Sequence, residues 1–196
     1  MKKMFLLMIA AASFATASAQ LSLGVKAGGQ MTTLSGNDYL DYDKWKGGFY
    51  AGVYGRYHVQ KNLSIQVEAL YSEQGAKGEF KSNLSNYKIT HTLNYFAVPL
   101  LVQYHLPVGL YVETGPQFAF KSKSKFKNED SGASNDYPAN DFDFSWVAGV
   151  GYKLGNKIGV NARFNLGFSN VIEITQTRSS NRAIQLGVSY ALFGKN

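Results

Sequence analysis

The stretch KIGVNARFNLGFS at residues 157–169 alternates strictly between two kinds of side chain. One set is apolar and falls on every second position: Ile158, Val160, Ala162, Phe164, Leu166 and Phe168. The intervening set is small or polar: Gly159, Asn161, Arg163, Asn165 and Gly167. Because successive side chains of a β-strand point to opposite faces, this period of two residues predicts a strand with one apolar and one polar face.

The same alternation recurs in eight segments of the chain. They cover residues 21–34, 47–59, 62–74, 88–106, 109–121, 141–154, 157–169 and 182–193. Alternation alone does not distinguish a soluble β-sandwich from a membrane barrel, because both folds have one dry face. Each segment is nevertheless long enough to cross a bilayer as a tilted strand, which takes about nine to eleven residues.

The connections between the segments separate these two folds. The links after the second, fourth and sixth segments are tight, at residues 60–61, 107–108 and 155–156, whereas the other links are long and polar. Short turns on one side and long loops on the other are typical of outer-membrane barrels. We therefore expect an all-β fold, an eight-stranded antiparallel up-and-down transmembrane β-barrel in a bacterial outer membrane, with both termini of the mature chain in the periplasm.

The first residues have the pattern of an export signal. Lys2 and Lys3 precede an apolar run at residues 4–12, and small residues follow up to Ala17-Ser18-Ala19. This pattern predicts cleavage after Ala19, so that residues 1–19 are a cleaved signal peptide and residues 20–196 form the barrel domain. A membrane anchor helix is the alternative, but the apolar run is too short to span a bilayer.

Aromatic residues lie at matching heights in the predicted strands. Four tyrosines lie near the ends of the segments that lead to tight turns or to the C-terminus: Tyr57, Tyr104, Tyr152 and Tyr190. A tyrosine ring suits the membrane–water interface, so we expect a periplasmic aromatic girdle. An outer girdle is expected from Phe118, Phe120, Phe142, Phe144 and Phe168. The alternative, aromatic strand formers in a soluble core, does not predict equal heights.

Six charged residues fall on the polar face of the segments: Lys26, Arg56, Glu68, Glu113, Lys153 and Arg163. A lone buried charge is costly, and eight strands leave an interior just wide enough for side chains. We therefore expect an ion-pair network that plugs the lumen, with the two glutamates as acceptors and the arginines as bidentate partners. The alternative is a narrow pore whose selectivity these charges set.

The sequence contains no motif that predicts an enzyme, a metal site or a cofactor. Cysteine is absent, which excludes disulfides and thiolate metal ligands. His58 and His105 are expected as hydrogen-bonded lumen residues, because two scattered histidines are too few for a metal site. His91 has no convincing catalytic partner in the sequence. We expect no catalytic activity, no cofactor and no bound metal.

Several short stretches occur in a characteristic order: LGVKAG at 23–28, YFAVPLLV at 95–102, YVETGP at 111–116, GVGY at 149–152 and RFNLG at 163–167. In these the chain resembles the PorT-like outer-membrane β-barrel family, a branch of small porin-like barrels in the wider group that includes OmpA-like barrels. The last strand is similar to the signal that the outer-membrane assembly machinery reads, with Gln185, Gly187, Tyr190 and Leu192. The resemblance implies a fold and a location, with roles in secretion or surface assembly for some relatives.

Two functions are compatible with these sequence features. The first is a structural or interaction protein of the envelope with a plugged lumen, and the second is a small porin that passes solutes. Expected partners are outer-membrane lipids and lipopolysaccharide, the assembly machinery and envelope proteins. Lipopolysaccharide phosphates are candidate ligands for four lysines of the third long link: Lys121, Lys123, Lys125 and Lys127. The net charge of +7 comes without a long basic run, so we expect no nucleic-acid binding.

Overall fold

The computed structural model describes residues 20–35, 41–82, 85–128, 134–136, 140–169 and 180–194. These residues form nine strands: β1 (Leu21–Ser35), β2 (Asp41–Gln60), β3 (Leu63–Ser82), β4 (Ser85–His105), β5 (Leu110–Asn128), β6 (Ser134–Asp136), β7 (Phe142–Leu154), β8 (Ile158–Gly167) and β9 (Ser180–Phe193). None of the described residues forms a helix long and apolar enough to cross a membrane. The predicted signal peptide, residues 1–19, lies outside the described residues.

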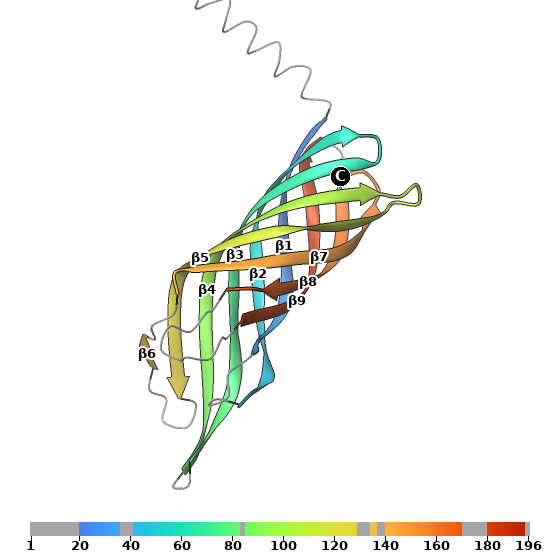
Figure 1. Ribbon diagram of the computed structural model, residues 1–196. Helices are drawn as coiled ribbons and strands as arrows, with labels where there is room; N and C mark the ends of the chain where they lie inside the picture. Colours follow the sequence, from blue (N-terminus) through green and yellow to red (C-terminus); the bar gives the residue numbers. More distant parts are fainter. Residues whose placement is uncertain are drawn as a thin grey trace, which may run out of the picture.

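Eight of the described strands close into an antiparallel barrel in the order β1-β2-β3-β4-β5-β7-β8-β9 (Figure 1). The barrel closes where β9 pairs with β1, with Gln30 opposite Gln185. Closure pairs the backbone groups that a sheet edge would leave free. In a membrane these groups must be paired within the protein, because lipid offers no hydrogen-bond partner. The predicted fold, an eight-stranded antiparallel barrel, is confirmed.

The outer part of the barrel differs from the prediction. The expected long loop between the third and fourth segments is wrong, because β3 continues to Ser82 and β4 begins at Ser85. The two strands remain paired over this whole extension, which projects far beyond the other strands in Figure 1. β6 was not predicted; it pairs with Lys125 to Lys127 of β5. Beyond the membrane both faces of a hairpin meet water, so strand pairing continues there without an apolar face to reveal it in the sequence.

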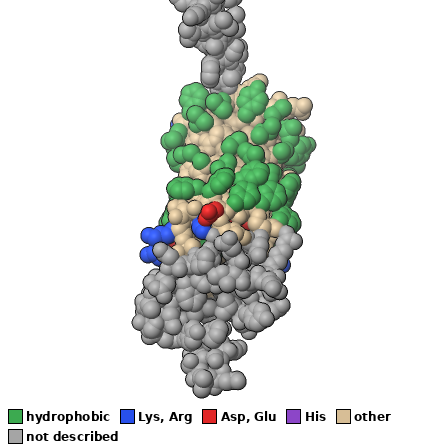
Figure 2. Space-filling view, turned by 60° about the vertical axis from the view of Figure 1, so that its left-hand side comes forward, with side chains coloured by type: hydrophobic (Ala, Val, Ile, Leu, Met, Phe, Trp, Pro, Cys, Tyr) green, Lys and Arg blue, Asp and Glu red, His purple; other side chains and the backbone are tan. Residues whose placement is uncertain are grey.

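The two faces of the barrel wall carry different side chains. Polar and charged residues line the inside and are buried, whereas large hydrophobic residues cover the outside and are exposed. Figure 2 shows these hydrophobic side chains over most of the visible described surface. The exposed apolar surface is the expected lipid contact of a membrane barrel.

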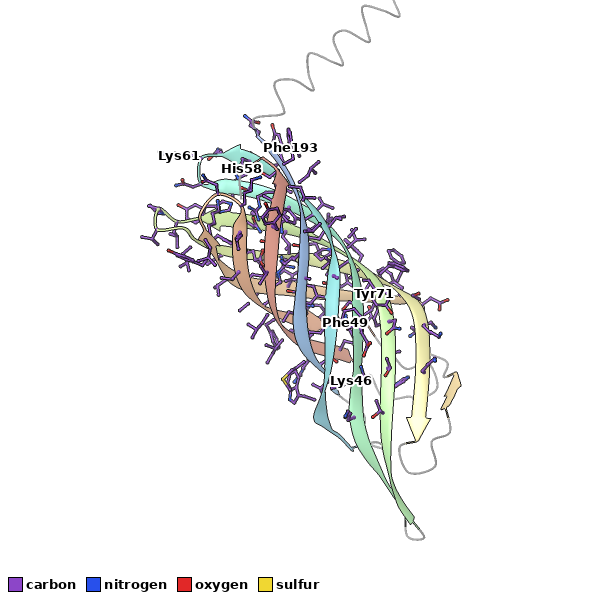
Figure 3. All side chains as sticks on the ribbon, turned by 180° about the vertical axis from the view of Figure 1, so that it is seen from behind. Lys46, Phe49, His58, Lys61, Tyr71 and Phe193 are labelled. Carbon is purple, nitrogen blue, oxygen red and sulfur yellow. The ribbon has the colours of Figure 1, made fainter. Side chains whose placement is uncertain are left out.

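The tight turns and both ends of the described barrel lie at one end of the molecule. Gly194 lies beside the backbone of Leu21, and Leu23 pairs with Phe193. In Figure 3, Lys61 of the β2–β3 turn and Phe193 lie at the same end of the barrel, whereas Lys46 is toward the other end. We call these the turn end and the loop end.

Candidate functional site in the barrel lumen

Four charged side chains meet at the centre of the lumen. They are Lys26 of β1, Glu68 of β3, Glu113 of β5 and Arg163 of β8, and all are buried. The four strands are spread around the closed barrel, so the charges enter the lumen from different sides. We call this set the central charge layer; its two positive and two negative charges balance.

Arg163 joins both glutamates. Its Nη1 and Nη2 donate to Oε2 and Oε1 of Glu68 at 2.7 and 2.6 Å. Its Nε and Nη2 donate to Oε1 and Oε2 of Glu113 at 2.5 and 3.1 Å. Since β8 and β3 lie opposite each other in the barrel, the pair of Arg163 and Glu68 crosses the whole lumen. Lys26 completes the layer, with its Nζ 3.2 Å from Oε1 of Glu68.

A glycine on the intervening strand makes room for this contact. Gly149 of β7 is the register partner of both Glu113 and Arg163. A Cβ atom at this position would lie 2.9 Å from Cγ of Arg163 and 3.2 Å from Oε1 of Glu113. This role of Gly149 was not predicted from the sequence, because only the strand register places the glycine between the two charges.

The other two predicted lumen charges lie outside the central charge layer. Nε of Arg56 donates to Oε1 of Gln66 at 2.8 Å, and Nε2 of Gln66 donates to Oε1 of Glu68 at 2.5 Å. The guanidinium of Arg56 also lies 5.3 Å from the ring centroid of Tyr54, within the range of a cation–π contact. Arg56 therefore joins the layer through Gln66, a residue that was not among the predicted lumen charges.

Lys153 is a correction to the predicted network. It is half-buried and makes no ion pair with any residue that the structure describes. It lies four residues beyond Gly149 along β7, which is about 13 Å of strand. At that height Lys153 faces the turn end of the lumen, beyond the reach of the two glutamates.

Tyrosines fill the space around the charges. Tyr50, Tyr54 and Tyr111 are buried, and each lies against inward-facing glycines of other strands. An added Cβ would meet the Tyr54 ring at Gly24 and the Tyr111 ring at Gly151. The glycines thus accommodate large rings in a narrow interior, which agrees with the side-chain-filled lumen expected of eight strands.

Amide and hydroxyl groups continue the polar packing toward the loop end. Gln30 accepts a hydrogen bond from Nε2 of Gln185 at 2.8 Å, and its own Nε2 donates to Oγ of Ser72 at 2.9 Å. Nε2 of Gln117 donates to Oγ of Ser145 at 3.1 Å. These residues fall on the inward-facing positions of their strands, and this alternation is the sequence signal that could have predicted them.

The histidines occupy both ends of the lumen. The rings of His58 and His105 stack with centroids 5.9 Å apart at the turn end, and Nε2 of His105 lies 2.8 Å from Oγ of Ser64. His91 lies toward the loop end, with Nε2 3.3 Å from Oγ of Ser124. In the part of the chain that the structure describes, no three His, Cys, Asp or Glu residues are grouped as metal ligands.

The aromatic residues expected at the lipid boundary point outward. Tyr57, Tyr104, Tyr152 and Tyr190 are 41–49% exposed. At the outer level, Phe118 contacts Phe142 and Phe144, and Phe120 contacts Phe142. Phe168 contacts Phe144.

The outer aromatic level extends further than predicted. Phe49 contacts Tyr71, Tyr71 contacts Phe96, and Phe96 is the register partner of Phe120. Figure 3 shows Phe49 and Tyr71 close together between the two ends of the barrel. We call the combined set the aromatic belt: Phe49, Tyr71, Phe96, Phe118, Phe120, Phe142, Phe144 and Phe168.

The residues of the expected assembly signal lie on both faces of β9. Gln185 faces the lumen, where it donates to Gln30, and Gly187 lies beside the hydroxyl of Tyr50. Tyr190 and Leu192 are exposed on the outer face.

This polar, filled lumen inside an apolar wall agrees with the comparison to known protein families. The model of the family described as outer membrane protein beta-barrel domain matches residues 12–173, well over half of the chain. The chain belongs to this family. It is therefore an outer-membrane β-barrel protein of bacteria. A comparison with curated proteins found no significant match.

Solved structures of small outer-membrane barrels share the fold. Ail of Yersinia pestis is 14% identical with a TM-score of 0.51, and the match covers 88% of this chain and 99% of Ail. Neisserial surface protein A is 12% identical with a TM-score of 0.53, covering 86% and 96%. OprG of Pseudomonas aeruginosa is 13% identical with a TM-score of 0.51, covering 90% and 98%. At these identities the likeness concerns the fold alone.

Proposed function

We propose that this protein is a non-conducting scaffold of the outer membrane whose outer strands and loops make contacts in the cell envelope, in secretion or surface assembly. The observation that carries the proposal is the bidentate pair of Arg163 and Glu68, which crosses the lumen. The resemblance to PorT-like barrels supports the same class of role, and no catalytic role is assigned.

The sealing argument rests on packing and charge. Each member of the central charge layer is buried, and tyrosine rings occupy the neighbouring space. An ion that crossed this layer would have to separate buried charge pairs, which costs several kcal/mol for each broken pair. A steady open pathway is therefore unfavourable in this arrangement.

Conductance in a planar bilayer tests the proposal. The purified barrel is expected to give no steady conductance. The positive control replaces the central charge layer by Lys26→Ala, Glu68→Ala, Glu113→Ala and Arg163→Ala, which should open a water path and raise the conductance. Both proteins must first show the heat-dependent gel shift of a folded barrel. A steady open conductance in the unmodified protein would overturn the scaffold proposal in favour of the small porin.

We further propose that the turn end faces the periplasm and that both termini of the mature chain lie there. Short turns on the periplasmic side are the rule for such barrels, and the tyrosine girdle lies at this end. Because the chain has no cysteine, single cysteines report the orientation cleanly. In intact cells a membrane-impermeant PEG-maleimide should label Ser122→Cys and spare Asn156→Cys until the outer membrane is opened. The reverse pattern would refute the orientation.

We also propose how the protein is exported and recognised for assembly. Residues 1–19 serve as the cleaved signal, and the pattern of Gln185, Gly187, Tyr190 and Leu192 in β9 serves recognition by the assembly machinery. The intact mass of the protein purified from outer membranes should correspond to a chain that begins at Gln20. Outer-membrane lipids and lipopolysaccharide are the proposed surroundings of the wall.

A further inference from the structure

A β-bulge in β5 changes which face its lysines occupy. In the pairing of β4 with β5, Asn94 lies opposite Lys123 but Tyr95 lies opposite Lys121, so Ser122 is an extra residue. An extra residue reverses the alternation of faces beyond it. Phe118 and Phe120 point outward before the bulge, and strict alternation would direct Lys123 and Lys125 inward.

The side chains beyond the bulge follow the reversed pattern. Ser124 is buried and lies 3.3 Å from Nε2 of His91, toward the lumen. Lys123 and Lys125 are exposed on the outer wall. The bulge therefore places two lysines on the same face of β5 as the aromatic belt.

The two lysines lie at a height that suits lipid headgroups. Phe96 and Phe120 are paired across β4 and β5 and are 57% and 52% exposed, which marks the outer margin of the lipid-facing wall. Lys123 is three residues beyond Phe120, but its partner Asn94 is only two residues from Phe96, because Ser122 is the extra residue of the bulge. For a strand tilted by about 45° two positions are about 5 Å along the membrane normal, at the inner margin of the headgroup layer of about 5–8 Å.

The charges around these lysines leave them available for an anion. Lys121 forms an ion pair with Asp141 at 2.8 Å, whereas Lys123 and Lys125 make no ion pair with a described residue. Lys123 lies opposite Asn94, and Lys125 lies opposite Asp136 of β6, the acidic residue nearest in register. Figure 2 shows Lys and Arg side chains at the border between the hydrophobic surface and the undescribed part.

We propose that Lys123 and Lys125 form a binding site for the phosphate groups of an outer-leaflet lipid. The acyl chains of that lipid lie against Phe118 and Phe120, and its phosphates reach the two ammonium groups above them. A soluble phosphate gains only the charge contact, so the adjacent apolar wall favours a lipid. The inference rests on the proposed orientation, in which the loop end faces outward.

Native mass spectrometry of the folded barrel in detergent tests the site. The probe is lipid A carrying two phosphates, compared with lipid A from which both phosphates have been removed. The double variant Lys123→Gln and Lys125→Gln should weaken binding of the bisphosphorylated lipid by about five-fold for each lysine. Raised salt should reduce the difference between the wild type and the double variant.

The matched control removes two lysines at the turn end, Lys61→Gln and Lys157→Gln, and should leave lipid binding unchanged. An equal loss in this control would show a general charge effect and overturn the site, as would unchanged binding in the Lys123 and Lys125 variant. Competition by inorganic phosphate at the same concentration as the lipid would overturn the choice of a lipid. A conducting barrel would refute the scaffold and leave this result intact.

Discussion

The space beside a glycine differs between the inner and the outer face of the barrel wall. On the inner face, the space beside Gly149 is occupied by Arg163 and Glu113. On the outer face, a Cβ added at Gly29 would meet no atom within 4 Å. The lumen is thus packed like a protein core, with its central charges held by named partners, while the outer wall is covered by fluid lipid. Substitutions should therefore be far more costly inside than outside.

The strongest contrast should come from the two glycines. Gly149→Leu places a branched side chain where Arg163 crosses to Glu113, and we expect loss of the folded barrel. Gly29→Leu adds apolar surface to a lipid-facing wall and should leave the folded fraction unchanged. Heat-dependent mobility on gels after refolding into detergent measures both. A folded Gly149→Leu barrel would show that the lumen has more free space than its packing indicates.

A buried charge pair and a rim pair should differ by several kcal/mol. Glu68→Gln leaves Lys26 without its carboxylate and Arg163 with only one, and should destabilise the barrel by about 3–5 kcal/mol. Glu73→Gln breaks a pair with Lys46 at 2.6 Å near the lumen rim, and should cost about 1 kcal/mol. Urea unfolding in phospholipid vesicles measures both values. Equal losses would contradict the contrast between centre and rim.

On the outer face, the stability cost of a charged substitution should depend on its depth in the membrane. Val53 is 55% exposed and lies midway between Phe49 and Tyr57 on β2. Val53→Arg should cost about 2–4 kcal/mol in vesicles, whereas Val59→Arg, beside the turn, should cost about 0–1 kcal/mol. The same unfolding measurement applies. A loss independent of depth would argue that this wall does not face lipid.

The smallest effect concerns a polar contact on the outer face. Nε1 of Trp146 donates to Oγ1 of Thr114 at 2.8 Å. A double-mutant cycle with Trp146→Phe and Thr114→Val should give a coupling of about 0.6 kcal/mol, the average for hydrogen bonds in membrane proteins. A coupling of several kcal/mol would mean that outward contacts are as specific as those of the lumen.

The sequence predicted the local features of the barrel correctly and missed features that depend on contacts between distant strands. Alternation along residues 157–169 indicated the strands and their faces, because the side-chain period of a strand is a local property. The inward positions of Lys26, Glu68, Glu113 and Arg163 followed from the same parity. Parity does not give height, however, and for this reason Lys153 was wrongly included in the charge network.

The sequence by itself therefore determined a chain of alternating strands, with three tight links and with aromatic residues near the ends of the strands. Only the tertiary structure decided which inward residues meet, since Arg163 and Glu68 are 95 residues apart and their contact depends on the register of every strand between them. It also decided the face of Lys123, because the extra residue Ser122 is recognisable only against its partner strand. Register is a relation between strands, and no single strand carries it.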